Sequence, residues 1–323
     1  MCTAISFLTK DHYFGRNLDL EHSYAEQVTV TPRHFPFRFR HRETIKRHYA
    51  MIGMATVADG YPLYYEATNE KGLSMAGLNF PGNAFYRPPE NGKVNIATFE
   101  LIPWILGQCE TITQVRSLLE PINLTNTAFS EAFPPSPLHW MICDRNHSIV
   151  VESTKEGIRI YNDPVGLLTN NPPFPYHLLR LAEFMNLSRE EPENRFSGQL
   201  ELTPYSRGMG AMGLPGDLSS SSRFIKAAFT KLNSVCSDDE ISSVTQFFHI
   251  LGAVAQQSGC VKVNDAYEKT LYTSCCNTDK GIYYYTTYEN SRITAIRLKE
   301  EDMVKRELTS FPLVTTQQIR YEN

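Results

Sequence analysis

The stretch MCTAISFLTKDHYFGRNLDL, residues 1–20, indicates how the fold begins. Ile5 to Phe7 has the apolar character of a short strand, and the polar pair Lys10-Asp11 suits a turn. The chain is then expected to return along Phe14 to Asp19 as the second strand of a hairpin. Such a hairpin would bring the charged residues of the return strand beside the N-terminus, so this stretch predicts a sheet that carries polar groups at its start.

Cys2 is a candidate nucleophile because of its position. Initiator methionine is generally removed when the next residue is small, and removal of Met1 would leave Cys2 with a free α-amine beside its thiol. An α-amino group titrates close to neutral pH, so one residue can supply both a nucleophile and its base. Many chains begin with Met-Cys by chance, so position alone does not establish this role.

Arg16 and Asp19 add weight to the candidate. A nearby cation stabilises a thiolate, and a carboxylate can accept a hydrogen bond from an amine and orient it. An Arg-x-x-Asp pair by itself is more often a surface ion pair worth ~0–1 kcal/mol. Its combination with Cys2 in one predicted hairpin is what indicates a reactive site.

Composition excludes several classes of function. The chain has 323 residues, 41% of them hydrophobic, and a formal net charge of -4. This balance produces no overall field that would gather nucleic acid or an acidic membrane surface. No run approaches the roughly 20 apolar residues of a spanning helix, and residues 1–30 lack the apolar core of a signal peptide. We expect a cytoplasmic protein that forms one domain over residues 1–323.

The remaining pattern predicts helical layers over antiparallel sheets, an α+β fold. Alternating Phe35, Phe37 and Phe39 suggest a solvated ribbon at a sheet edge, despite the basic residues between them. Further ranges follow the same reasoning. Strands are expected at 28–32, 49–57, 138–143, 148–153, 158–161, 282–288 and 293–298, and helices at 96–109, 111–119, 176–184, 222–232 and 241–255, with Thr111 as an N-cap.

Several motifs point to no cofactor and no metal. Gly208 to Gly213 matches G-x-G-x-x-G, but Leu214-Pro215-Gly216-Asp217 follows, where a dinucleotide fold would need a helix. The histidines lack zinc-site spacing, and the seven cysteines are scattered, which favours reduced thiols over disulfides. The serine-hydrolase signatures are absent as well.

The sequence resembles the choloylglycine hydrolase family, which includes bile salt hydrolases and penicillin V acylases. The resemblance extends over nearly the whole chain. It rests on Met1-Cys2-Thr3, Phe14 to Asp19, Asn69 to Leu73, Ala76 to Pro81, Leu138-His139-Trp140, Leu168-Thr169-Asn170, Gly213 to Asp217, Ser222-Arg223-Phe224 and Tyr283-Tyr284-Tyr285.

This resemblance implies a four-layer αββα sandwich, the N-terminal nucleophile hydrolase fold, and hydrolysis of a non-peptide amide. It implies Cys2 as nucleophile, flanked by Arg16 and Asp19. It further implies that Asn79 and Asn170 help form the oxyanion hole and that Arg223 completes the polar site. Losing one oxyanion donor typically costs ~10²–10³ in rate, so these residues are expected to matter.

The implied substrate is a conjugated bile salt, a small molecule, because Asn79 in Leu78-Asn79-Phe80-Pro81 resembles the bile salt branch more than the penicillin V branch. A steroid needs a broad apolar wall. By resemblance, the wall would include Leu18, Tyr24, Tyr65, Phe129 and Phe133, and the assembly would be a homotetramer. Three alternatives remain open: a penicillin V acylase, an N-acyl homoserine lactone acylase, and a bile acid binder without turnover.

Overall fold

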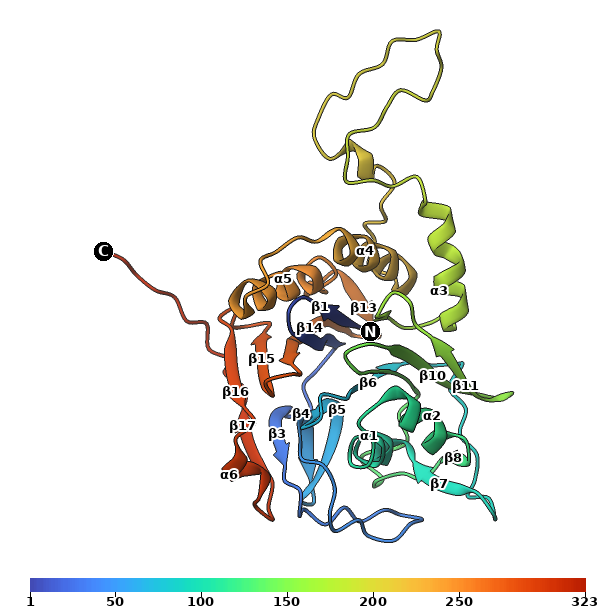
Figure 1. Cartoon of the computed structure of the whole chain (residues 1–323), viewed down its shortest axis with the longest axis vertical. Coiled ribbons are helices and arrows are strands. Elements are labelled where there is room, and N and C mark those ends of the chain that lie inside the picture. The colour runs from blue at the N-terminus through green and yellow to red at the C-terminus, as the bar shows by residue number, and fades with distance from the viewer.

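Two large antiparallel sheets form the centre of the molecule, which is described by a computed structural model of residues 1–323 (Figure 1). The first sheet has the order β12-β1-β2-β14-β15-β16, with β13 paired to β14. Its strands are β1 (Cys2–Leu8), β2 (His12–Leu20), β12 (Leu167–Leu168), β13 (Val261–Val263), β14 (Ala266–Asn277), β15 (Ile282–Thr287) and β16 (Thr294–Arg297).

The second sheet has the order β11-β10-β9-β6-β5-β4-β3-β17. Its strands are β3 (Gln27–Thr31), β4 (Met51–Ala58), β5 (Tyr61–Asn69), β6 (Ser74–Asn79), β9 (Leu138–Cys143), β10 (Ser148–Thr154), β11 (Gly157–Asn162) and β17 (Thr309–Pro312). A separate parallel pair joins β7 (Val94–Ala97) to β8 (Ile122–Thr125).

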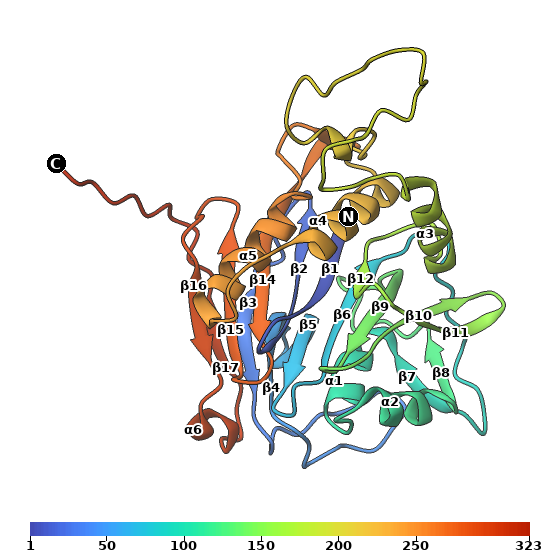
Figure 2. The same ribbon diagram turned by 45° about the horizontal axis from the view of Figure 1, so that its top comes forward.

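Helices cover the outer face of each sheet and complete four layers (Figure 2). The first sheet is covered by α4 (Ser220–Asn233) and α5 (Glu240–Gly252), and the second by α1 (Leu101–Leu106) and α2 (Ile112–Leu119). The short helices α3 (Phe174–Arg180) and α6 (Glu300–Met303) and the 3-10 turns Thr98–Glu100, Leu181–Phe184 and Met209–Ala211 lie outside these pairs. The predicted αββα sandwich is therefore confirmed.

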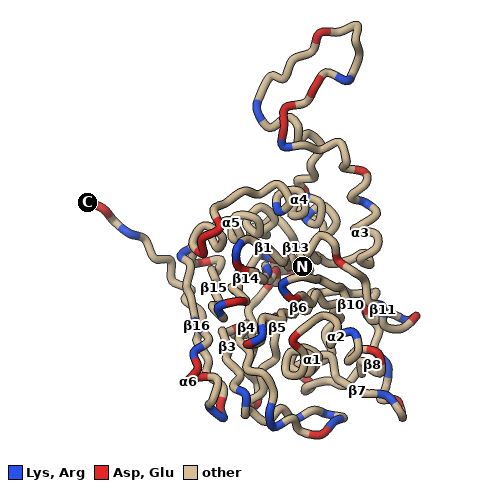
Figure 3. The backbone as a smooth tube through the Cα atoms, viewed as in Figure 1, with Lys and Arg blue, Asp and Glu red and all other residues tan.

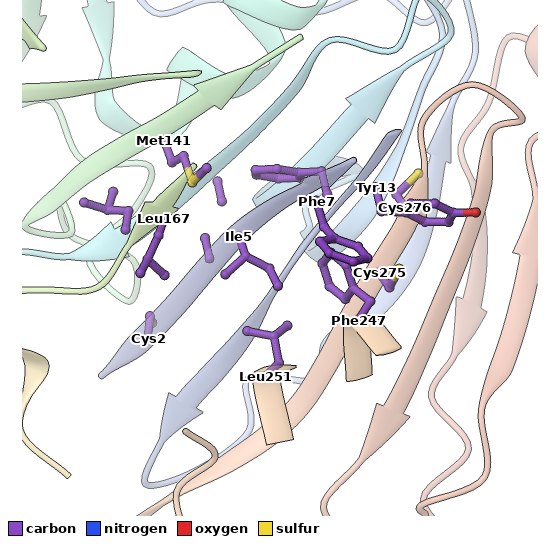
Figure 4. Packing of buried hydrophobic residues seen from close by; sticks show 14 of the residues in the cluster. Cys2, Ile5, Phe7, Tyr13, Met141, Leu167, Phe247, Leu251, Cys275 and Cys276 are labelled. Carbon is purple, nitrogen blue, oxygen red and sulfur yellow. The ribbon is translucent and has the colours of Figure 1, made fainter. Parts of the chain in front are cut away.

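Apolar side chains fill the layers on both sides of the N-terminal strand. Figure 4 shows Ile5 and Phe7 of β1 close to Phe247 and Leu251 of α5, with Met141 of β9 on the other side. A second cluster packs α1 and α2 against the outer face of the second sheet. Burial on both faces of β1 and β2 fixes the register of this hairpin, because a slip by one residue would exchange the two faces.

Most of the elements expected from the sequence are present. The hairpin pairs Cys2 with Leu18, α2 begins after its N-cap Thr111, and α4 begins after Ser219. The meander β9-β10-β11 and the hairpin β15-β16 also agree with expectation. The glycine motif at 208–213 lies in a loop with a 3-10 turn, as its flanking proline and glycine predicted.

Two expectations were wrong. Residues 35–40 form no ribbon: one isolated bridge joins Phe37 to Ile45, and the rings of Phe37 and Phe39 pack inward instead. Pro36 lacks the N–H that a ladder needs, which explains the missing strand. The expected helix at 96–109 begins as strand β7, because its pairing with β8 outweighs local propensity, and becomes α-helical only at Leu101.

No helix of the structure combines the length and apolar character that a membrane-spanning segment requires. Two segments project from the sandwich in both views: a loop after α3 and the C-terminal tail (Figures 1 and 2). The expectation of one domain over residues 1–323 stays a prediction.

Gly15 offers a direct test of the packing between β2 and β14. A Cβ atom at this position would lie 2.0 Å from the carbonyl oxygen of Ser274, which belongs to the backbone of the neighbouring strand. Gly15→Ala should therefore lower the free energy of unfolding, measured by urea denaturation, by about 1–3 kcal/mol. Gly252→Ala is the control, since nothing lies within 4 Å of its Cβ position; equal stabilities for the two variants would contradict this packing.

Candidate active site

The β1–β2 register sorts the predicted site residues onto two faces of one hairpin. Cys2 faces Leu18, and Ala4 faces Arg16, so these side chains share the face that points toward the second sheet. Asp19 follows Leu18 and therefore points to the opposite face. Cys2 is 2% exposed. The thiol and the backbone nitrogen of one residue thus meet two different environments.

Arg16 spans the gap between the two sheets on the thiol side. Its Nη1 donates to the carbonyl oxygens of Gly77 at 2.5 Å and Tyr65 at 3.2 Å, while Nη2 has no hydrogen-bond partner. Burial alone would lower the pKa of Arg16, but the neighbouring Cys2 thiol, the Tyr272 phenol and two carboxyls raise it above its usual range. Arg16 therefore remains a cation beside Cys2.

The buried carboxyl group of Glu66 lies beside the Arg16 guanidinium. Glu66 on β5 lies 3.9 Å from Nε of Arg16 and accepts hydrogen bonds from the hydroxyls of Tyr272 at 2.7 Å and Tyr283 at 2.5 Å. Burial raises the pKa of Glu66, and Arg16 opposes that shift. The arrangement restrains the guanidinium from both ends.

Asp19 lies on the face of the hairpin opposite to the Cys2 thiol. One of its carboxylate oxygens accepts a hydrogen bond, and the other has no hydrogen-bond partner. Oγ1 of Thr270 on β14 donates to Oδ1 at 2.6 Å, whereas Oδ2 has no hydrogen-bond partner and lies 4.0 Å from Nη1 of Arg223. Burial raises the pKa of Asp19, and the Arg223 cation opposes the rise. A buried acceptor without a donor is costly, which marks this oxygen as available for a further N–H.

Arg223 connects α4 to the start of β1. Its Nη1 donates to the Cys2 carbonyl and to Oγ1 of Thr3, both at 2.6 Å, and its Nη2 donates to Oδ1 of Asn170 at 2.8 Å. The side chain is 1% exposed, and burial lowers the pKa of Arg223. One guanidinium therefore fixes the backbone of the first strand and a second site residue.

Asn170 lies where Cys2 and the end of β6 meet. Its Oδ1 accepts a hydrogen bond from the Cys2 nitrogen at 2.8 Å, and its Nδ2 donates to the carbonyl oxygen of Asn79 at 2.7 Å. An amide NH₂ group has two hydrogens, so one remains available after the bond to Asn79. Residues from both sheets thus meet at Cys2.

Met1 is held by two contacts in front of Cys2. Its ammonium donates to the carbonyl oxygen of Asp19 at 2.7 Å and pairs with Oε2 of Glu268 at 2.7 Å. Burial raises the pKa of Glu268, and the ammonium opposes that rise. Removal of Met1 would turn the Cys2 nitrogen into an α-amine that is already in contact with Asn170.

An apolar cavity of about 360 Å³ opens beside the Cys2 thiol. Cys2, Arg16 and Asn79 line it together with the predicted wall residues Leu18, Tyr24, Tyr65, Phe129 and Phe133. Asp19, Asn170 and Arg223 belong to the polar cluster behind it and are not among the lining residues. The volume and apolar character suit a small organic ligand with a few polar groups at one end.

Sequence reasoning missed Glu66, Glu268 and Thr270, which contact the predicted residues directly. A signal for Glu66 was present: a single carboxylate within the apolar run from Tyr61 to Thr68. Buried charges require partners, so such a residue within a strand is a candidate for a polar site. Glu268 and Thr270 carried no comparable signal, because only the pairing of β14 with β2 brings them to the N-terminus.

Comparison with known proteins identifies the family of the chain. A model of the linear amide C–N hydrolases, choloylglycine hydrolase family, matches residues 2–311. The chain belongs to the choloylglycine hydrolase family. It is thus an amidohydrolase of that family, with the N-terminal nucleophile hydrolase fold.

Individual relatives match along nearly their whole length. The chain is 54% identical over 314 residues to a bile salt hydrolase/transferase of Lactiplantibacillus plantarum, covering 97% of each chain. It is 36% identical to a C2A mutant of the conjugated bile acid hydrolase from Clostridium perfringens, whose crystal structure matches with a TM-score of 0.92 and full coverage of both chains. A penicillin V acylase of Agrobacterium tumefaciens shares the fold, at 17% identity, a TM-score of 0.73 and coverage of 96% and 91%.

The position of Arg16 predicts that alkylating reagents react with Cys2 in preference to the buried cysteines. Iodoacetamide at neutral pH should alkylate Cys2, which lines the cavity beside the Arg16 cation, and the exposed Cys260. It should spare the buried thiols, since burial raises the pKa of Cys109 to about 11 and of Cys276 to about 12. Peptide mass spectrometry gives the labelling rate at each site.

Arg16→Met should slow labelling of Cys2 at least severalfold and leave Cys260 unchanged. Arg38→Met, which alters an exposed arginine, serves as the matched control. Unchanged labelling of Cys2 in Arg16→Met would contradict the electrostatic role of Arg16.

Proposed function

We propose that this protein hydrolyses the amide bond of glycine- or taurine-conjugated bile salts with Cys2 as an N-terminal nucleophile. The main support for the proposal is that the thiol and the nitrogen of Cys2 lie in two different surroundings. Its thiol side lines an apolar cavity beside Arg16, and its nitrogen lies 2.8 Å from Oδ1 of Asn170 within a polar cluster. A residue that is both nucleophile and base needs these two surroundings.

In the first step, the Cys2 sulfur attacks the carbonyl carbon of the amide. The thiol proton passes to the Cys2 α-amine, which becomes free once Met1 is removed. Asp19 and Asn170 orient that amine through Oδ2 and Oδ1, and Arg223 holds the Cys2 carbonyl and Asn170 in place. The role of Arg16 is to stabilise the thiolate.

Negative charge then develops on the carbonyl oxygen of the substrate. We propose that the free N–H of the Asn170 amide and groups at Asn79 donate to this oxygen, and their mutual hydrogen bond of 2.7 Å supports a shared role. The α-ammonium next gives its proton to the departing nitrogen, the C–N bond breaks, and glycine or taurine leaves. A thioester between Cys2 and the bile acid remains.

Water completes the reaction by the same route. The α-amine takes a proton from the attacking water, and the water oxygen adds to the thioester carbon. The C–S bond then breaks as the α-ammonium returns its proton to the departing sulfur. Bile acid and the free thiol result, so atoms and protons balance with no cofactor or metal in the scheme.

The choice of substrate rests on the relatives and on the cavity. The relative from Clostridium perfringens that is 37% identical over the full length of both chains is a bile salt hydrolase/transferase. In this chain the wall formed by Leu18, Tyr65, Phe129 and Phe133 supports an extended apolar acyl group. Penicillin V and N-acyl homoserine lactones are alternative amides for the same site, and a binder without turnover is the non-enzymatic alternative.

A mass measurement combined with a substrate panel tests the proposal. Intact mass should show loss of Met1, and the purified protein should release glycine or taurine from conjugated bile salts with a kcat/KM well above that for penicillin V or an N-acyl homoserine lactone. Release from penicillin V alone would move the protein to the acylase branch. Loss of Met1 without turnover of any of these amides would contradict the proposal and favour the binder.

Cys2→Ala should abolish turnover, because no other thiol lines the cavity. Circular dichroism and thermal unfolding should remain close to those of the unaltered protein, since alanine fits the volume of the cysteine site. Residual hydrolysis by a correctly folded Cys2→Ala protein would exclude Cys2 as the nucleophile.

We also propose assembly into a homotetramer. Residues 186–208 include a loop that projects from the sandwich (Figure 1), and this loop exposes large apolar side chains. Phe196 is 81% and Tyr205 is 82% exposed, and Leu200 and Leu202 lie between them. Charges of both signs occur along the same loop (Figure 3), so its apolar residues are the feature that favours a protein partner. A cytoplasmic location stays a prediction.

Light scattering tests the assembly. The unaltered protein should have about four times the mass of one chain, and Phe196→Ser combined with Tyr205→Ser should lower that mass. Tyr321→Ser, which alters an exposed residue of the C-terminal tail, should leave it unchanged. A monomeric unaltered protein would contradict this part of the proposal.

A further inference from the structure

Two buried histidines contact the backbone that carries Asn170. Nε2 of His177 lies 2.9 Å from the carbonyl oxygen of Asn170, and Nε2 of His139 lies 3.0 Å from the carbonyl oxygen of Thr169. The backbone N–H of Asn170 donates to Oγ of Ser220 at 2.8 Å. The peptide units on both sides of Asn170 are therefore fixed by hydrogen bonds from other elements.

These contacts determine where the protons of both rings are. A carbonyl oxygen can only accept, so Nε2 carries hydrogen in His139 and in His177. Nδ1 of His177 has no hydrogen-bond partner, and burial lowers the pKa of His177 to about 4. His177 is thus a neutral donor at the pH at which the enzyme would work.

Glu152 on β10 holds the second ring in place. Its Oε1 lies 3.2 Å from Nδ1 of His139 and accepts the backbone N–H of Phe174 at 2.9 Å. His139, Glu152 and Phe174 are all buried. Through these contacts Glu152 connects β9 and β10 to the start of α3.

Each imidazole also stacks on a residue that adjoins the proposed site. His139 stacks on Phe80 with centroids 4.3 Å apart and an interplanar angle of 6°, and Phe80 directly follows Asn79. His177 stacks on Phe224 with centroids 4.8 Å apart and an angle of 19°, and Phe224 directly follows Arg223. The two rings therefore join three separate chain segments.

We propose that His139 and His177 are positioning residues that hold the Asn170 amide in register with Asn79, Cys2 and Arg223. This inference rests on the proposed function, because it assigns the histidines to the oxyanion donor of that reaction. Both histidines are fully buried, and the Nε2 donor of each is occupied by a backbone carbonyl oxygen, so neither ring donates to substrate. Both act through Asn170, whose side chain joins Cys2, Arg223 and Asn79.

A donor that is displaced in the transition state lowers kcat more than it changes KM. His177→Leu keeps an apolar side chain of similar bulk against Phe224 but lacks the N–H, and it should lower kcat about 10–100-fold with KM within about threefold. His177→Gln can place an N–H near the position of Nε2 and should recover most of the loss. The same comparison applies to His139→Leu and His139→Gln.

The control is His147→Leu, which alters a histidine that is 72% exposed and should leave kcat unchanged. A double-mutant cycle with Asn170→Ala then separates positioning from a general structural effect. If His177 acts through Asn170, His177→Leu should cause little further loss of kcat in the Asn170→Ala protein. Fully additive losses in folded proteins would overturn the inference.

A spectroscopic readout keeps this inference separate from the proposed reaction. The side-chain NH₂ signals of Asn170 should shift in the ¹⁵N spectrum of His177→Leu and remain nearly in place in His177→Gln. Unchanged Asn170 signals in both leucine variants would overturn the positioning role, whatever the substrate is. Absence of turnover in the unaltered protein would instead contradict the proposed function, while the ¹⁵N result would still decide the role of the histidines.

Discussion

The antiparallel register of β1 and β2 is the constraint on which the rest of the site depends. Pairing of Cys2 with Leu18 places Arg16 beside the thiol on the face toward the second sheet and turns Asp19 toward the other face. Apolar burial on both sides of the hairpin, by α5 and by the second sheet, makes any other register costly. The register therefore explains why the Cys2 thiol faces the apolar cavity while its nitrogen lies in the polar cluster.

Burial of several charges beside that hairpin is the main energetic cost of the arrangement. Arg16 and Asp19 are both 0% exposed, and Arg223 is 1% exposed. Buried ions persist only with partners and good hydrogen bonds, and here they are supplied by backbone carbonyls, by Thr270 and by the Glu66 cluster. Nη2 of Arg16 and Oδ2 of Asp19 are buried without hydrogen-bond partners, which the proposed reaction explains if they act on the thiolate and the α-amine.

Local pattern predicted the features that depend on neighbours in the sequence. The hairpin and the N-cap at Thr111 followed from turn and capping chemistry. The resemblance of short motifs indicated which residues gather at Cys2. The features that could not be predicted depend on contacts between segments far apart in the sequence. Parallel pairing with β8 converts residues 94–97 to a strand, aromatic packing draws Phe37 inward, and β14 brings Glu268 and Thr270 to the N-terminus from about 250 residues away in the chain.

The most direct test of the central claim is rapid-quench mass spectrometry of the enzyme during turnover of a conjugated bile salt. The protein trapped during turnover should lack Met1 and carry one bile acyl group, and fragmentation should locate that group on the sulfur of Cys2. Turnover without any covalent acyl group at short quench times and low pH, or an acyl group on another residue, would contradict a thioester at Cys2.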